Sequence, residues 1–246
     1  MKPSLNNPKL KVERAKEHLD VLDVKLVEFQ DLKPFRVTTY ENTEHTHYVI
    51  SSQIPIIDPK LAVLAGDVIY SLRSALDHIA WQLALTTTDR PRDRTAFPII
   101  DKDTPEKLKR FNDITGDIPT DAVNEVKGLQ PYLRGPAYKD DLLWKLDKLC
   151  NIDKHRVIPA SGTAIDFKIP KSLDASSLIF ERLDDACIVA MPIAFKAQMQ
   201  FAPEPIPDIV LGSQIDGLTM SIRELGKIYT YVQDTVLPRF TRFFPE

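Results

Sequence analysis

The sequence predicts an α+β fold in which a helical bundle packs with an antiparallel β-sheet, and three observations lead to this prediction. Long stretches at both ends of the chain carry apolar residues at helical spacing. Two other stretches are rich in Val, Thr and short apolar runs separated by turn residues, a pattern typical of short strands. The 246 residues are 43% hydrophobic, enough to bury one large core, so we expect a single domain over residues 1–246. The expected layers are helical at about 8–33, 58–156 and 213–243, and β at about 35–53 and 160–202.

The chain begins with an amphipathic helix over residues 8–32, where charged residues separate regularly spaced apolar ones. A β-hairpin follows, with strands at 35–40 and 47–53 around a polar turn. His45 and His47 lie at this turn with no Cys or further His nearby in the sequence. We therefore expect them to be turn residues, and we expect no metal site in the chain.

Residues 59–85 form the most strongly patterned helix. Asp58 is the expected N-cap, and Pro59 takes the first helical position, where its missing N–H costs nothing. A wide apolar face predicts that this helix lies in the core. The face consists of Leu61, Val68, Leu72, Ala75, Leu76, Ile79 and Leu83.

The remaining elements follow from turn residues and periodicity. Thr104 is the expected cap of a short helix, and a second short helix ends near Gly128. The acidic pairs Asp140-Asp141 and Asp184-Asp185 are expected at solvated cap or turn positions. Tail residues 239–244 mix Arg and Phe, which we interpret as core packing with a solvated edge. We expect helices near 59–85, 141–156 and 213–237, the last ending near Pro238, to pack together, and antiparallel strands at 35–53 and 163–201.

Composition and motifs exclude several classes of function. The net charge of −3 gives no overall basic surplus for nucleic acid. Neither a GxGxxG nor a GxxxxGK[ST] loop is present, and no apolar run is long enough to span a membrane. The N-terminus has no secretion signal, and Cys150 and Cys187 are far apart without a CxxC pattern. We therefore expect a cytoplasmic protein with reduced thiols, although the sequence leaves a single disulfide open.

One side of the 59–85 helix is polar but carries neither Lys nor Glu, which suits a buried cleft or a helix–helix interface better than open water. Arg73 and His78 are about 140° apart on this helix, with Ser74 and Asp77 between them. Two interpretations stay open. Arg73 and Asp77 form a structural i,i+4 pair and His78 is a hydrogen-bonded core residue, or Arg73 grips an anionic ligand and His78 moves a proton.

A second polar segment, NIDKHR at residues 151–156, follows an amphipathic helix. Its basic residues suit the C-terminal end of a helix, where they bond the last carbonyls. Alternatively, Asn151, Asp153 or His155 faces Arg73 and His78 and completes a polar site, with an Asp153–Arg73 pair holding the guanidinium. On this second interpretation we expect one of the three side chains within hydrogen-bonding reach of the Arg73–His78 face.

The string RSALDH at residues 73–78 matches the R-x4-6-H motif of the HEPN superfamily. The longer string GDVIYSLRSALDHIAWQL resembles a family of uncharacterised bacterial proteins with the motif GDxxxxLRSALDHxxW, and NIDKHR resembles that family's NxDKHR motif. Together the strings cover about a tenth of the chain. Nucleolytic HEPN proteins usually carry Asn, Asp or His where this chain has Ser74, and the sheet-rich second half is not part of a minimal HEPN bundle.

The resemblance implies a metal-independent endoribonuclease that needs no cofactor. Arg73 would bind the scissile phosphate, and His78 would act as base on the ribose 2′-OH or as acid to the leaving oxygen, yielding a 2′,3′-cyclic phosphate. The alternative is a non-catalytic module that binds a protein, RNA or a nucleotide. The supporting residues in either case are Ser74, Asp77, Asn151, Asp153 and His155.

The wide angle between Arg73 and His78 also predicts how the chain assembles. Side chains so far apart on one helix do not easily converge on one phosphate. Two copies of the helix, related by a two-fold axis, would bring two such pairs into one groove. We therefore expect a homodimer whose interface includes the Tyr70–Trp81 face.

Overall fold

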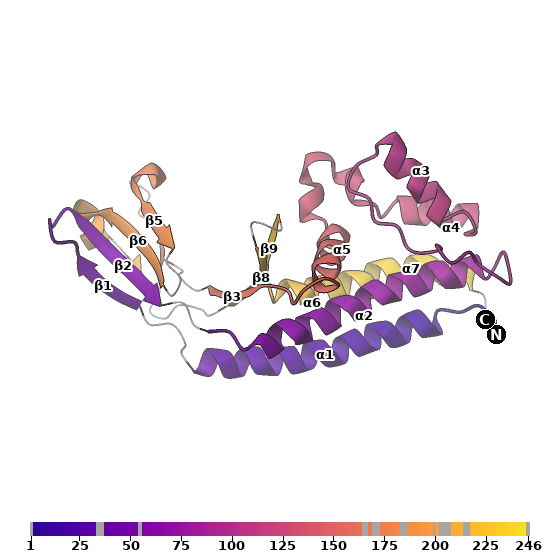
Figure 1. The fold of residues 1–246 in the computed structure, drawn as a ribbon, viewed down its shortest axis with the longest axis horizontal. Helices are drawn as coiled ribbons and strands as arrows, with labels where there is room; N and C mark the ends of the chain where they lie inside the picture. Colours follow the sequence, from indigo (N-terminus) through magenta and orange to yellow (C-terminus); the bar gives the residue numbers. More distant parts are fainter. Residues whose placement is uncertain are drawn as a thin grey trace. The chain divides into compact units, whose positions relative to one another are not determined.

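The protein has an α+β fold, as predicted (Figure 1). The computed structural model describes residues 2–32, 37–53, 56–163, 167–168, 173–182, 186–198, 200–201, 208–213 and 217–244. The chain divides into two compact units. The helical unit comprises Met1–Leu22, Ala62–Pro159 and Gly212–Glu246, and the sheet unit comprises Asp23–Leu61 and Ala160–Leu211. The expectation of a single domain stays a prediction.

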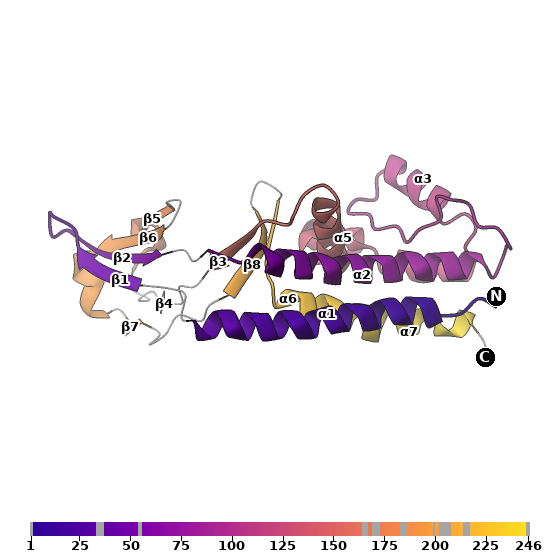
Figure 2. The same ribbon diagram turned by 60° about the horizontal axis from the view of Figure 1, so that its bottom comes forward.

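Two long helices frame the helical unit. In it α1 and α2 lie side by side and run antiparallel (Figures 1 and 2). The predicted apolar face of α2 is buried, and Leu72, Leu76 and Leu83 are fully covered. The helices are α1 (Asn6–Asp31), α2 (Pro59–Ala84), α3 (Pro105–Ile114), α4 (Thr120–Lys127), α5 (Leu142–Asp153), α6 (Glu224–Tyr231) and α7 (Leu237–Phe240), with 3-10 turns η1 (Pro131–Asp140) and η5 (Thr241–Phe243) and a π-helical turn η4 (Val232–Val236).

Polar side chains cap α2 and α3 at the positions that the sequence predicted. The Asp58 carboxylate accepts from the Lys60 amide at 2.9 Å, and the Thr104 hydroxyl accepts from the Lys107 amide at the start of α3. Asp141 caps α5, but the prediction that it is solvated is wrong, because its side chain is buried and bonds the Arg134 guanidinium at 2.5 Å. The bond to the cation offsets part of the cost of burying this side chain. Asp184 and Asp185 lie outside the described residues.

The expected helix over 213–237 is only partly correct. Residues Leu218–Ser221 form strand β9, in which the buried Leu218 and Met220 alternate with more exposed residues, and α6 begins later, at Glu224. Gly217 ahead of the strand has φ +71°, a conformation that ends regular helix. The helix also continues past Pro238, because the π-helical turn lets the Leu237 amide bond the Val232 carbonyl and the proline falls in the first turn of α7.

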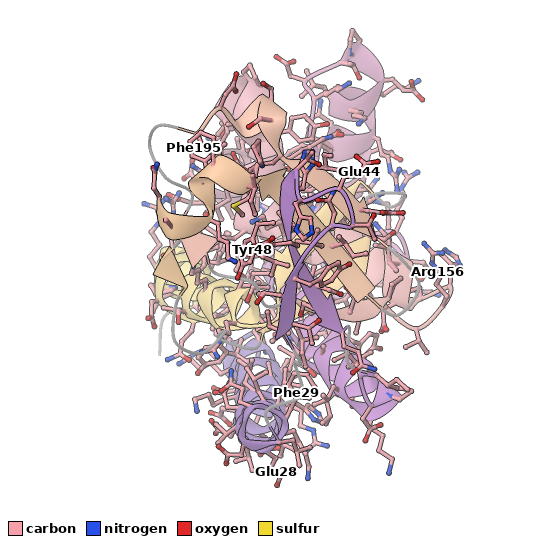
Figure 3. All side chains as sticks on the ribbon, turned by 90° about the vertical axis from the view of Figure 1, so that its left-hand side faces the viewer. Glu28, Phe29, Glu44, Tyr48, Arg156 and Phe195 are labelled. Atoms are coloured by element: carbon pink, nitrogen blue, oxygen red, sulfur yellow. The ribbon has the colours of Figure 1, made fainter. Side chains whose placement is uncertain are left out.

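The sheet unit contains a four-stranded antiparallel sheet with strand order β1-β2-β6-β5. Its first two strands are the predicted hairpin, with Glu44 in the turn (Figure 3). Tyr48, Ile50 and Val189 belong to the apolar cluster of the sheet, which Phe195 also contacts (Tyr48 and Phe195 are labelled in Figure 3). The elements are β1 (Val37–Glu41), β2 (His47–Gln53), β5 (Ile179–Arg182), β6 (Ala186–Pro192), η2 (Ala175–Ser177) and η3 (Ile193–Gln198).

Shorter strands complete the β structure. Strand β4 (Phe167–Lys168) pairs with β7 (Gln200–Phe201), and β3 (Ala160–Thr163) pairs with β8 (Asp208–Ser213), both antiparallel. Strand β9 is the third strand of the β3-β8-β9 sheet. At the hairpin turn His45 bonds Glu41 and His47 bonds Thr46. Across the part of the chain that is described, no helix has the length and apolar character needed to cross a membrane.

Candidate functional site

Arg73, at the centre of α2, is held by three acceptors from its own chain. Its Nη1 donates to Asp77 Oδ1 at 2.5 Å, its Nη2 to the Phe97 carbonyl at 3.0 Å, and its Nε to Asp147 Oδ1 at 3.3 Å. The side chain is only 15% exposed. The structural i,i+4 pair between Arg73 and Asp77 is therefore confirmed. Because each guanidinium nitrogen already has an acceptor, the fork fixes the positions of α2, α5 and the chain at Phe97.

The chain at residues 96–101, which we call the 96–101 segment, has no regular secondary structure but is tied down by side chains. The Phe97 amide donates to Asp77 Oδ1 at 3.0 Å. Gln130 accepts from the Ile100 amide and donates to the Pro98 carbonyl, both at 2.9 Å, and it is 1% exposed. These bonds satisfy backbone groups that a sheet or helix would otherwise pair.

Apolar packing against the C-terminal tail also holds the 96–101 segment. The Phe97 ring is fully buried and meets Phe240 edge-on, with the ring centroids 6.2 Å apart. Phe240 belongs to the Arg- and Phe-rich tail, so the predicted core packing of that tail is confirmed for this residue. Edge-to-face aromatic contacts of this kind add to the energy of burial. The 96–101 segment is thus fixed by both polar and apolar contacts.

His78 faces a different neighbour from Arg73. It is half-buried, and burial lowers the pKa of its imidazole below 6.5, with the charge of Lys11 on α1 lowering that pKa further and Asp77 opposing both. No described residue forms a hydrogen bond with it, unlike the core histidine of the structural interpretation. Lys11 also lies over the Tyr70 ring, 5.9 Å from its centroid. Within one chain, Asp77 therefore acts on both Arg73 and His78, whereas Lys11 acts on His78 and Asp147 binds Arg73.

The NIDKHR segment contributes one residue, Asn151, to the hydrogen bonds around Arg73, which we call the Arg73 network. Asn151 Nδ2 donates to Asp147 Oδ2 at 3.0 Å, so Asn151 reaches Arg73 only through that carboxylate. Asp147, not Asp153, is the acidic partner of Arg73 on α5. His155 is exposed, and its backbone amide bonds the Ile152 carbonyl just after the end of α5, so the segment does lie at a helix end.

The GDVIYSLRSALDHIAWQL and NIDKHR strings approach each other at Gly66 and Asp153. A Cβ atom at Gly66 would lie 2.6 Å from Asp153 Oδ1, closer than real Cβ contacts allow. The glycine of the GDxxxxLRSALDHxxW string therefore lets α2 approach the Asp153 side chain of the NIDKHR string. Ser74, the remaining supporting residue, is half-buried and has no hydrogen bond to a described residue.

We expect Asp153→Asn to be more stable than the parent at pH 7. Burial raises the pKa of the Asp153 carboxyl above 3.8, and the nearby Asp67 raises it further. Because the folded state binds the proton more tightly than the unfolded state, ionisation lowers stability, and the penalty disappears as the pH falls through the raised pKa towards 3.8. Urea denaturation should show a higher midpoint for Asp153→Asn at pH 7 and a shrinking difference towards pH of about 4. The exposed Asp89→Asn is the control, and equal midpoints for both variants at pH 7 would refute the prediction.

Sequence reasoning missed Asp147 and Gln130. Asp147 shares a helix face with Asn151, four residues later, so a wheel of α5 could have indicated it. Nothing in the string GLQP distinguishes Gln130 from an exposed helix-end residue. When the chain is compared with protein-family models, curated proteins and solved structures, no match is found, so the functional assignment depends on the geometry of α2 and its neighbours.

Proposed function

We propose that the chain is a non-catalytic, HEPN-like interaction module that presents one side of α2 to a second copy of itself. The observation that carries the proposal is that Arg73, the residue that a nuclease would use to bind phosphate, is already bonded within its own chain. Its guanidinium is mostly covered and is held by two carboxylates and a carbonyl. A phosphate would have to displace those acceptors, and two carboxylates beside it would repel the anion.

The side of α2 that remains exposed is suited to a protein partner. Val63, Tyr70 and Trp81 are 50%, 57% and 37% exposed, and their spacing of seven and eleven residues places them on one stripe, which we call the α2 stripe. Tyr and Trp are enriched at protein interfaces because they bury much area with few rotatable bonds. In a two-fold pair the stripe meets its own copy, and Lys11 beside Tyr70 offers a cation to the partner's exposed Asp67.

A second candidate function is the metal-independent endoribonuclease. The lowered pKa of His78 and its lack of a hydrogen bond to a described residue favour it. With a lowered pKa and no hydrogen bond to a described residue, the imidazole is neutral at pH 7 and open to accept a proton from a ribose 2′-OH. Arg73 would have to exchange one acceptor for the scissile phosphate. The partner of the interaction module is a second copy of the chain, and the partner of the ribonuclease is RNA. We propose the cytoplasm as the site of action, because Cys150 is a buried, free thiol.

One set of preparations tests both candidates. For the module, light scattering after size-exclusion chromatography should give a dimer for the parent, and Trp81→Ala or Tyr70→Ala should weaken association about 30-fold. Leu133→Ala, which removes another exposed apolar side chain, should leave the dimer intact. A parent that is monomeric at about 100 μM, or a Leu133→Ala variant that dissociates equally, would contradict the proposal.

The same preparations are then incubated with a mixed RNA pool in excess EDTA. The module leaves the RNA intact. The ribonuclease cleaves it, and His78→Ala slows cleavage by about 10²–10⁴-fold. Arg73→Lys keeps a cation while losing the fork geometry, so it should also be slower. Cleavage by the parent would overturn the non-catalytic proposal, and folded His78→Ala with parental activity would eliminate the Arg73–His78 mechanism.

A further inference from the structure

A cleft of about 410 Å³ opens in the helical unit on the Arg73 side of α2. Its walls come from the 96–101 segment, α3 and α5, together with Arg73, while His78 and the α2 stripe do not line it. The volume lies in the range of small-molecule sites. The side chains that matter for its chemistry are Lys107, Arg110, Phe111, Trp144, Asn151 and Lys154.

The cleft holds more positive than negative charge. Its two carboxylates are engaged, since Asp101 pairs with Lys107, and Asp147 accepts from Arg73 and Asn151. Arg110 on α3 and Lys154 at the end of α5 line the same cleft, and neither side chain forms an ion pair or hydrogen bond with a described residue. Arg110 and Lys154 are therefore the two cations of the cleft that pair with no carboxylate of the described residues, and two such cations suit a phosphate group.

The rest of the lining is apolar and aromatic. Trp144 is half-buried, and Tyr138 meets its ring edge-on with the centroids 5.6 Å apart, so the indole is supported in place. Ile99 and Ile114 add aliphatic surface at the same cleft. A flat ring can stack on the indole while aliphatic groups cover its edges. Asn151 uses its amide nitrogen on Asp147, which leaves its carbonyl oxygen to accept from a ligand.

We propose that this cleft binds a small organic phosphate that carries a flat ring, with the phosphate on Arg110 and Lys154 and the ring against Trp144. The site does not depend on the function proposed for the α2 stripe, because the two share no lining residue. Its wall is preorganised, since Arg73 and Gln130 fix the 96–101 segment without any ligand. A preformed wall lowers the entropic cost of binding.

The test uses adenosine 5′-monophosphate as a ring with a phosphate, and adenosine and inorganic phosphate as its separate halves. Titration calorimetry on the full chain should show binding of the nucleotide at a Kd below about 1 mM, with each half binding at least about tenfold more weakly. In a Trp81→Phe background Trp144 is the single tryptophan, so the nucleotide should quench its fluorescence. No nucleotide binding up to about 1 mM, or equal binding of inorganic phosphate, would overturn the proposal.

Charge variants locate the site. Arg110→Gln and Lys154→Gln should each weaken nucleotide binding by about tenfold or more, since each removes a charge-assisted hydrogen bond. Neither side chain has a polar contact with a described residue, so both variants should fold as the parent does. Lys109→Gln, one residue earlier on α3 and outside the cleft, is the matched control. A loss in Lys109→Gln equal to that in Arg110→Gln would show general charge attraction and refute the site.

Discussion

Arg73→Met is expected to lower the free energy of unfolding by about 2–4 kcal/mol. Methionine keeps the apolar stem but removes all three donors. Asp77 and Asp147 then lose their cation, and the Phe97 carbonyl loses its donor. The two carboxylates are 40% and 31% exposed, so water screens part of the loss and keeps it below the cost of stranding a fully buried charge.

Urea denaturation followed by circular dichroism measures this effect. Arg110→Met is the matched control, because that guanidinium has no bond to a described residue. Arg73→Lys should fall between the parent and Arg73→Met, because an ammonium keeps the charge but cannot reach three acceptors with fork geometry. If Arg73→Met matches Arg110→Met within about 0.5 kcal/mol, the Arg73 network contributes nothing to stability.

The second large effect is expected at Gln130, where leucine should cost about 2–4 kcal/mol. Leucine nearly conserves the side-chain volume, so packing changes little while hydrogen bonds are lost. The Ile100 amide and the Pro98 carbonyl would then have no side-chain partner at a buried position. The Val126 carbonyl, which also accepts from Gln130, keeps the Gly128 and Leu129 amides as donors.

Hydrogen exchange at the Ile100 amide, combined with urea denaturation, tests this directly. Exchange at Ile100 should accelerate in Gln130→Leu before the rest of the helical unit opens. Gln82→Leu is the control, because Gln82 is half-buried and accepts one bond, from the Ser4 amide. Unchanged protection at Ile100 would mean that Gln130 does not secure the 96–101 segment.

The sequence predicted an element correctly where residues at its own ends specify it. Asp58 and Thr104 each precede a proline at the start of a helix, and the caps formed there. Strand β9 was missed because Leu218, Ile222 and Leu225 also satisfy helical spacing. The spacing of apolar residues does not reveal that Gly217 has a positive φ. This backbone conformation is incompatible with a regular helix that runs through Gly217 into Leu218.

The candidate site was predictable only where it is local. The Arg73–Asp77 pair follows from a spacing of four on a helix. The Phe97 carbonyl and Gln130 depend on an irregular segment whose position comes from contacts 20 to 32 residues away along the chain, and no periodic pattern encodes those. The sequence left the role of His78 open, and the influence of Lys11 on α1 on its pKa is a tertiary effect that a wheel of one helix cannot contain.

The close approach of Gly66 and Asp153 gives the GDVIYSLRSALDHIAWQL and NIDKHR strings a structural meaning. They are distant in the chain, yet a side chain at position 66 of the first would displace the Asp153 carboxylate of the second. A larger residue at position 66 would force the Asp153 carboxylate to move or would require a smaller side chain there, so the two positions are sterically coupled. The steric fit of two helices thus ties both strings to the architecture of the helical unit, whatever chemistry they carry.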